Sequence, residues 1–256
     1  TPCQSSAASD VYKRQGMKLK EVYKSSPFGV VSSFLIGISH SAVFSLIAVY
    51  ATSMNFSILE VSIVTFLFAI SGAISQWPIG KLSDVLDRRI VIIYTTFGAA
   101  LFCFLAIISS GQMYMPAGLA TSKLFFYICI MCFSFCSLPM FALIFAHTND
   151  FIPKEKFVAA GAGLQFVFGL GAICGPFMCS LFMEFLGENG FFIFLIIFHS
   201  FIGLFGIYRM QIRESGDNPD SQFAPMPQTI TPAGIELNPS TEPIDEPNNL
   251  NEFKKI

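Results

Sequence analysis

The sequence predicts an all-α integral membrane protein that forms a six-helix transmembrane bundle. Of its 256 residues, 53% are hydrophobic and only 12% are charged, which is about half the charged fraction of a typical soluble domain. The hydrophobic residues gather in six long blocks, and the alternating ten-residue segments typical of a membrane β-barrel are absent from the sequence. Apolar blocks of about twenty residues are long enough to cross the hydrocarbon core as helices.

Each block, taken in chain order, predicts one spanning helix. To within a few residues the blocks cover 28–51, 58–80, 90–109, 123–147, 157–183 and 190–209. Ser57 followed by Glu60 is a capping box that marks the start of the second helix, and Pro153 suits the first turn leading into the fifth. Three prolines predict kinks or breaks: Pro78, Pro139 and Pro176.

The basic residues indicate the orientation of the helices. One side of the bundle is predicted to carry ten of them, namely Lys18, Lys20, Lys24, Lys81, Arg88, Arg89, Lys154, Lys156, Arg209 and Arg213. The other side carries only Lys123. Because positively charged loops stay in the cytoplasm, both ends of the chain are predicted to be cytoplasmic.

Neither end of the chain is expected to belong to the bundle, which we assign to residues 28–210. Ser5–Gln15 reads SSAASDVYKRQ and matches the translation of a transposon-based sequencing adapter, so residues 1–15 are interpreted as an artefact and the chain as an N-terminally truncated fragment. Residues 16–27 are predicted to be a cytoplasmic linker. Residues 211–256 are acidic and poor in aromatic residues, which predicts a disordered tail.

The sequence argues against an enzyme. It contains no H-E-x-x-H, no G-x-S-x-G and no phosphate-binding loop. The cysteines lie mostly inside the apolar blocks, without metal-ligand spacing beside histidine. We therefore expect no catalytic residue, no metal site, no cofactor and no nucleic-acid partner.

The loop between the second and third blocks carries the most specific motif. It reads GKLSDVLDRR from Gly80 to Arg89 and resembles the signature loop of the major facilitator superfamily, G-x-L-x-D-R-x-G-R-R. The matching positions are Gly80, Leu82, Asp84, Arg88 and Arg89. Val85 and Asp87 stand where Arg and Gly are usual, so the contacts of the loop are expected to run outward rather than within it.

Four further segments resemble the C-terminal half of the bacterial sugar-transporter-like permease branch of this superfamily. They are Ser26–Val30, Ala146–Phe151, Gly171–Pro176 and Gly203–Met210, and the resemblance covers residues 17–213. It implies that the spans are helices 7 to 12 of a twelve-helix fold in the bacterial cytoplasmic (inner) membrane. The partner implied is the missing N-terminal six-helix half.

The resemblance also implies that the signature loop is a cytoplasmic gate. Asp84 would face the start of the eleventh helix near Lys154–Phe157, where the helix dipole stabilises a negative charge. Arg88 and Arg89 would pair with Asp150. These four residues, with the matching glycine and leucine, are the predicted gating residues. The alternative is an ordinary positively charged cytoplasmic loop.

Polar residues within the blocks are candidates for contact with a solute or a proton, because they are costly in a membrane. Ser33, His40 and Phe44 share one face of the first predicted helix, which lines the central cavity in this superfamily. Histidine titrates near neutral pH, although His40 could instead be hydrogen-bonded to a neighbouring helix. Ser134 and Ser137 on the fourth helix are further candidates.

Other positions are expected to be structural. The pattern Gly171-x-x-x-Gly175 permits close helix contact, and His199 on the sixth block is expected to hydrogen-bond within the bundle. His147 is expected to join the network around the signature loop.

These observations favour a secondary transporter that moves a small solute by alternating access, with a proton or another ion as the candidate coupling ion. The alternative is a non-transporting membrane sensor or assembly protein, which the acidic tail favours. The identity of the solute, the coupling ion and the direction of transport stay open.

Overall fold

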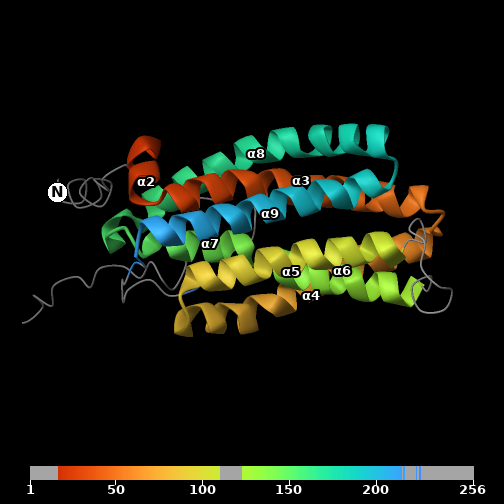
Figure 1. Cartoon of the computed structure of the whole chain (residues 1–256), viewed down its shortest axis with the longest axis horizontal. Coiled ribbons are helices and arrows are strands. Elements are labelled where there is room, and N and C mark those ends of the chain that lie inside the picture. Colours follow the sequence, from red (N-terminus) through yellow and green to blue (C-terminus); the bar gives the residue numbers. More distant parts are fainter. Residues whose placement is uncertain (1–16, 110–122, 215, 217–222, 224, 226–256) are drawn as a thin grey trace, which may run out of the picture.

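The computed structural model describes residues 17–109, 123–214, 216, 223 and 225. This part of the chain is helical and contains no strand. Six of its helical segments are long and apolar enough to cross a membrane, and they run side by side along the long axis of the molecule (Figure 1). The predicted fold class, a six-helix membrane bundle, is confirmed.

The spans agree with the six predicted blocks. They are built from α3 (Pro27–Ser53), α4 (Ile58–Val85), α5 (Arg88–Ser109), α6 (Lys123–Ser137) with α7 (Met140–Asn149), α8 (Phe157–Leu186) and α9 (Asn189–Ile212). The short η1 (Lys154–Lys156) precedes α8. Helix α4 extends to Val85 and α5 begins at Arg88, so most of the signature loop is helical and only Leu86 and Asp87 connect the two helices.

The fourth span is broken in the middle. Helix α6 ends at Ser137 and α7 begins at Met140, with Pro139 at its N-cap. Proline has no N–H to donate and its ring clashes with the preceding turn, which accounts for the break predicted there. Helices α4 and α8 continue through Pro78 and Pro176 without interruption.

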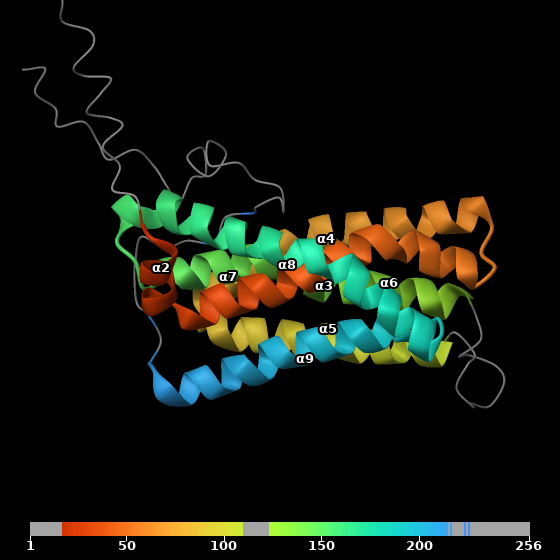
Figure 2. The same cartoon turned by 90° about the horizontal axis from the view of Figure 1, so that it is seen from above.

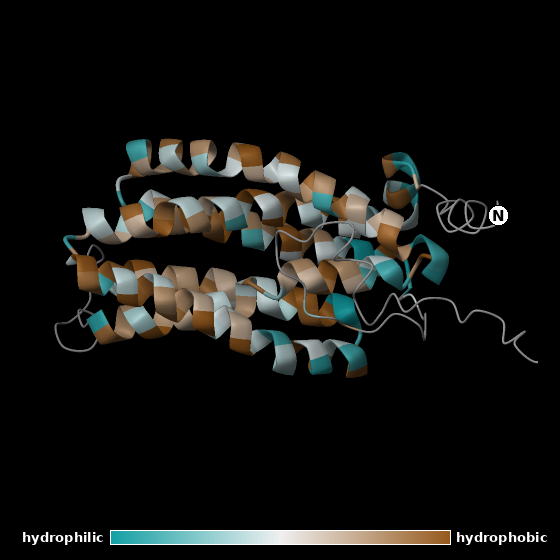
Figure 3. Cartoon of the chain, turned by 180° about the vertical axis from the view of Figure 1, so that it is seen from behind, coloured by the Kyte–Doolittle hydropathy of each residue, from teal (hydrophilic) through white to brown (hydrophobic). Residues whose placement is uncertain are grey.

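The two ends of the bundle differ in charge. The end where the α4–α5 connection meets the ends of α7 and α9 carries Arg88, Arg89 and Arg213, and we call it the basic end (Figures 1 and 2). At the opposite end, the capping box is confirmed: the Ser57 N–H donates to Glu60 Oε2 at 2.8 Å. Figure 3 shows hydrophobic residues along the middle of the helices and hydrophilic residues toward their ends.

Helices α3 and α8 pack closely against each other, and α8 lies across α3 in Figure 2. A Cβ atom built on Gly37 would lie 2.2 Å from the Phe168 carbonyl oxygen. One built on Gly171 or Gly175 would lie 2.2 Å from a carbonyl oxygen of α3. The close contact predicted for Gly171 and Gly175 is therefore confirmed.

Helices α4 and α8 are the least buried spans. In each, 28% of the most hydrophobic window is buried, against 50–67% in the other four spans. Their exposed side chains are mainly apolar: Phe66, Ile70, Ile74 and Trp77 on α4, and Phe166, Leu170, Ile173 and Phe177 on α8. These helices present apolar faces that the bundle itself does not cover.

The segments outside the bundle are described only in part. The predicted linker 16–27 contains a short helix, α2 (Leu19–Ser25), whose Val22 side chain is fully buried; this segment is therefore packed rather than extended. The predicted artefact, residues 1–15, lies outside the described residues. Of the predicted tail 211–256, only 211–214, 216, 223 and 225 are described.

Candidate functional site

Arg88 joins the ends of three helices at the basic end. It is the first residue of α5 and its side chain is 8% exposed. Its Nη2 atom donates to Asp84 Oδ1 of α4 at 2.9 Å, and its Nη1 atom pairs with the carboxylate of Asp150 at the end of α7. The Ala146 carbonyl oxygen also accepts from Nη1, at 3.3 Å. The predicted pair between Arg88 and Asp150 is confirmed.

Arg89 binds elsewhere. It donates to both carboxylate oxygens of Asp87, with Nη2–Oδ2 at 2.6 Å and Nε–Oδ1 at 3.1 Å. Burial raises the pKa of Asp87, but the hydrogen bonds from Arg89 outweigh it and hold this pKa below its ordinary value. Arg89 Nη1 also donates to the Arg213 carbonyl oxygen at 2.6 Å. The expected pair between Arg89 and Asp150 is not formed.

The expectation that the motif makes no internal contacts is therefore wrong. Asp84 and Arg88 are four residues apart and pair across the α4–α5 connection. Asp87, which occupies the usual glycine position, supplies a carboxylate two residues before Arg89. The departure from the family pattern thus supplies an ion pair within the loop.

Asp84 does not face the start of α8 as expected. Its Oδ1 atom accepts from Arg88 and from the backbone N–H of Phe223 at 2.9 Å. Helix α4 packs mainly on α6, α3 and α5, and α8 is not among its main neighbours. The side chain of Asp84 is 38% exposed, which makes it the most accessible carboxylate of the network.

The two remaining motif positions differ in their surroundings. A Cβ atom on Gly80 would lie 2.2 Å from Cδ1 of Phe223, so only glycine leaves room for this ring. Leu82 is about half exposed. Phe223 was missed because it lies in a polar stretch without periodicity, where an isolated aromatic residue was the only available signal.

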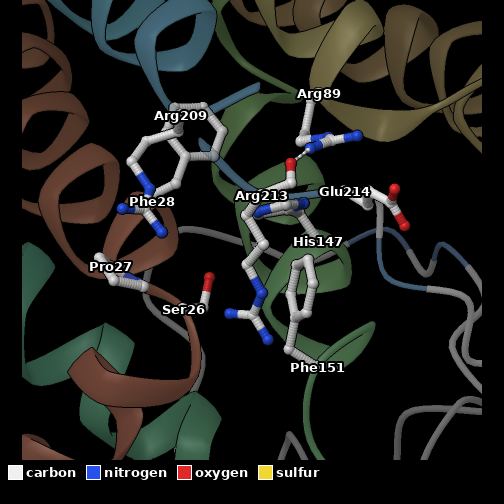
Figure 4. Close-up of a pocket in the computed structure, with 9 residues that line it drawn as sticks. All are labelled: Ser26, Pro27, Phe28, Arg89, His147, Phe151, Arg209, Arg213 and Glu214. Atoms are coloured by element: carbon white, nitrogen blue, oxygen red, sulfur yellow. Dashed lines mark hydrogen bonds between the residues drawn. The ribbon is translucent and has the colours of Figure 1, made fainter. Parts of the chain in front are cut away.

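A small pocket opens beside this network, between the ends of α3, α5, α7 and α9 (Figure 4). Its lining consists of Ser26, Pro27, Phe28, Arg89, His147, Phe151, Arg209, Arg213 and Glu214. The His147 ring packs edge-on against Phe28 and Phe151, with centroids 5.2 and 5.1 Å apart. His147 Nδ1 lies 3.9 Å from Asp150 Oδ2. His147 therefore joins the network, as predicted.

A second polar cluster lies inside the bundle, where His40, Ser137 and His199 are all buried. His199 Nδ1 is 2.9 Å from the Leu195 carbonyl oxygen, which can only accept, so this nitrogen carries the proton in the neutral ring. His199 Nε2 then accepts from Ser137 Oγ at 2.8 Å. Ser137 Oγ in turn accepts from His40 Nε2 at 3.1 Å.

This cluster connects α3, α6 and α9 immediately before the break at Pro139. The hydrogen bond expected for His199 is confirmed. The contacts of His40 agree with the alternative in which it bonds to a neighbouring helix, and its role toward a solute or proton stays a prediction.

The other candidates for the solute site are not brought together. Ser33 is buried and donates to the Leu164 carbonyl oxygen at 2.9 Å, and Ser134 donates to the Phe68 carbonyl oxygen. Phe44 is 53% exposed on the surface of α3. The predicted face of α3 is thus divided between the bundle interior and the surface.

Six apolar helical spans with a charged network at one end define a multi-pass membrane protein. Residues 29–243 match the family described as the Major Facilitator Superfamily. The chain belongs to this superfamily.

Three relatives illustrate the similarity. The chain is 23% identical over 201 residues to the "Uncharacterized MFS-type transporter YE1530" of Yersinia enterocolitica, covering 78% of this chain and 47% of that protein. It is 27% identical over 186 residues to YfkF of Bacillus subtilis, with 70% and 44% covered. For Ent638_1421 of Enterobacter sp. the identity is 24% over 191 residues, with 75% and 45% covered. YfkF and Ent638_1421 are also named as uncharacterized MFS-type transporters.

The chain spans about half the length of the curated relatives it matches. No solved structure matches it.

Proposed function

We propose that this chain is the C-terminal six-helix half of a secondary transporter that moves a small solute by alternating access, and that its basic end is a cytoplasmic gate. The observation that carries the proposal is the guanidinium of Arg88, which binds Asp84 and Asp150 at once. Membership of the superfamily and the printed names of the relatives support a membrane transporter.

The gate would act through charge-assisted hydrogen bonds. Each such bond contributes about 1.5–3 kcal/mol when it is shielded from water, and Arg88 is largely shielded. While Arg88 holds Asp84 and Asp150, the basic ends of α4, α5 and α7 stay together. Separation of these ends would admit water, which would replace the lost contacts and open the cytoplasmic side.

The exposed apolar faces of α4 and α8 support the need for a second half. We propose that an N-terminal six-helix half packs on these two faces, and that the solute site lies between the halves. The protein would lie in the bacterial cytoplasmic membrane, in the sugar-transporter-like branch. The hydrogen-bonded side chains of His40, Ser137 and His199 are the candidate route for a coupling proton.

Transport by the product of the complete gene tests the gate. Cells that express it would be assayed for uptake and efflux of a panel of labelled sugars, amino acids and organic cations. We expect Asp84→Asn and Arg88→Gln to reduce transport of any accepted solute at least tenfold. The matched control is Glu60→Gln, which removes the ion pair with Lys123 at the opposite end and should retain most activity. Transport at the wild-type rate by Asp84→Asn would exclude the gate.

One contact favours the alternative function, a non-transporting sensor or assembly protein. Phe223, beyond α9, contacts Gly80 and bonds to Asp84, so one residue C-terminal to α9 lies on the signature motif. In a sensor this residue would report on the state of the motif. A complete gene product that moves no solute in the panel, and whose Phe223→Ala variant moves none either, would favour this alternative.

A further inference from the structure

We propose that Arg209 and Arg213, at the mouth of the pocket at the basic end, bind the phosphate of an anionic phospholipid headgroup. The pocket lies between α3, α5, α7 and α9, and three arginines line it: Arg89, Arg209 and Arg213 (Figure 4). The gate does not require the last two of these side chains. Two features point to such a lipid: the arrangement of the arginines and the apolar surface of α9, the helix that carries Arg209 and precedes Arg213.

Two of the three guanidinium groups have donors to spare. Arg213 lies over the Phe151 ring at 4.0 Å and donates one hydrogen bond, from Nη1 to the Ser25 carbonyl oxygen at 2.5 Å. A guanidinium has five N–H donors. The side chain of half-buried Arg209 has no hydrogen bond or ion pair among the described residues. In Figure 4 these two guanidinium groups lie on either side of Ser26.

Arg89 has a different role in this pocket. Its side chain donates to both oxygens of Asp87 and to the Arg213 carbonyl oxygen. Its charge is therefore compensated, and its bond to the backbone of Arg213 fixes the position of that residue. Arg89 positions the pocket rather than binding the ligand.

Among the described residues that line the pocket, the charge that remains is positive. Glu214 is the one acidic side chain of this described lining; it is exposed and pairs with no described residue. The pocket also includes Ser26 and Pro27 at the start of α3, where the helix dipole adds partial positive charge. Paired guanidinium forks fit the oxygens of a phosphate, to which each can donate two hydrogen bonds.

The apolar surface of α9 near these arginines favours a lipid as the source of the phosphate. Leu204, Ile207 and Tyr208 are exposed on α9 within the five residues before Arg209. Acyl chains lying on these side chains would hold a lipid at this end of α9, with its headgroup at the level of Arg209 and Arg213. If the basic end is cytoplasmic, as proposed above, it faces the leaflet that carries anionic lipids, which attract basic residues.

Lipid binding can be measured without any transport assay. The product of the complete gene would be purified in detergent and mixed with phosphatidylglycerol or phosphatidylcholine, and bound lipid would be counted by native mass spectrometry. We expect preferential retention of phosphatidylglycerol. Arg209→Gln and Arg213→Gln should each weaken this binding about tenfold or more. Lys154→Gln, which removes a basic-end charge outside the pocket, should leave it unchanged, and Glu214→Gln should strengthen it.

Three results would overturn the proposal. They are equal retention of the two lipids, equal binding of phosphatidylglycerol by Arg209→Gln and the wild type, and displacement of the lipid by millimolar inorganic phosphate, which would indicate a site for free phosphate. Loss of the Ser25 contact could unfold Arg213→Gln. The Glu214→Gln variant therefore provides an independent test. If it binds phosphatidylglycerol no more tightly than the wild type does, the proposed lipid site is contradicted.

Discussion

At the scale of single residues, the charged side chains of the basic end differ in how deeply they are buried. Arg88 and Asp150 are both largely buried, whereas Asp84 is more than one-third exposed. Removing one partner of a buried ion pair leaves the other charged in a medium of low dielectric, which costs about 3–5 kcal/mol. The same change at a fully exposed pair costs little, because water screens the charges; the pair of Asp84 with buried Arg88 lies between these two cases.

Arg88→Met is therefore expected to destabilise the folded protein strongly, by about 3 kcal/mol. The double variant Arg88→Met/Asp150→Asn should recover a large part of this loss, because it removes the buried negative charge at position 150 together with the guanidinium that compensates it. Thermal unfolding of the purified complete protein measures both effects. A double variant less stable than Arg88→Met alone would show that the buried charge of Asp150 is not the source of the loss.

The hydrogen-bonded chain inside the bundle makes a second prediction. Ser137→Ala removes the hydroxyl between His40 and His199, which leaves His199 Nε2 without its donor and should cost about 1–3 kcal/mol. Ser75→Ala is the matched control, since Ser75 is equally buried but bonds only within its own helix, to the Gly72 carbonyl oxygen. Equal shifts of the unfolding temperature in the two variants would refute a special role for Ser137.

At the scale of helices, close packing of α3 on α8 depends on particular glycines. Gly171→Ala would place a Cβ atom 2.2 Å from the Phe34 carbonyl oxygen and force the two backbones apart, so the unfolding temperature should fall by several degrees. Gly169→Ala lies on the same helix with nothing within 4 Å, and alanine favours helix by roughly 0.5–1 kcal/mol. This control should be neutral or slightly stabilising. A reversed order of the two variants would contradict the packing described here.

The sequence predicted the helices better than it predicted the contacts between their side chains. Hydropathy reports how much apolar surface a segment must hide from water, so the six spans followed directly from the blocks, and the ring of Pro139 accounts for the break. Hydropathy does not report which polar groups meet. The pair between Asp87 and Arg89 and the bond from Phe223 to Asp84 depend on the three-dimensional course of the chain. The pairing of Arg88 with Asp150 was predictable only through the resemblance to a family.

At the scale of the whole molecule, the proposed function requires a second six-helix half. This half would cover the exposed apolar faces of α4 and α8. Cys174, on α8, is the only exposed cysteine among the described residues. If an N-terminal half covers α8, a hydrophobic maleimide should label Cys174 readily in this chain and at least tenfold more slowly in the complete protein. A cysteine introduced at exposed Leu204 on α9 serves as the control, and it should react equally in both. Equal labelling of Cys174 in both proteins would place the second half elsewhere.

The break in the fourth span also has a consequence for biogenesis. Helices α6 and α7 have 15 and 10 residues, about 22 and 15 Å at 1.5 Å per residue, so neither is long enough to cross the bilayer alone. Insertion by the translocon responds to the summed hydrophobicity of a segment, which is continuous from Lys123 to Asn149. The nascent chain can therefore enter the membrane as one hydrophobic unit. Ser137 can form its hydrogen bonds with His40 and His199 only when α3 and α9 have packed beside α6.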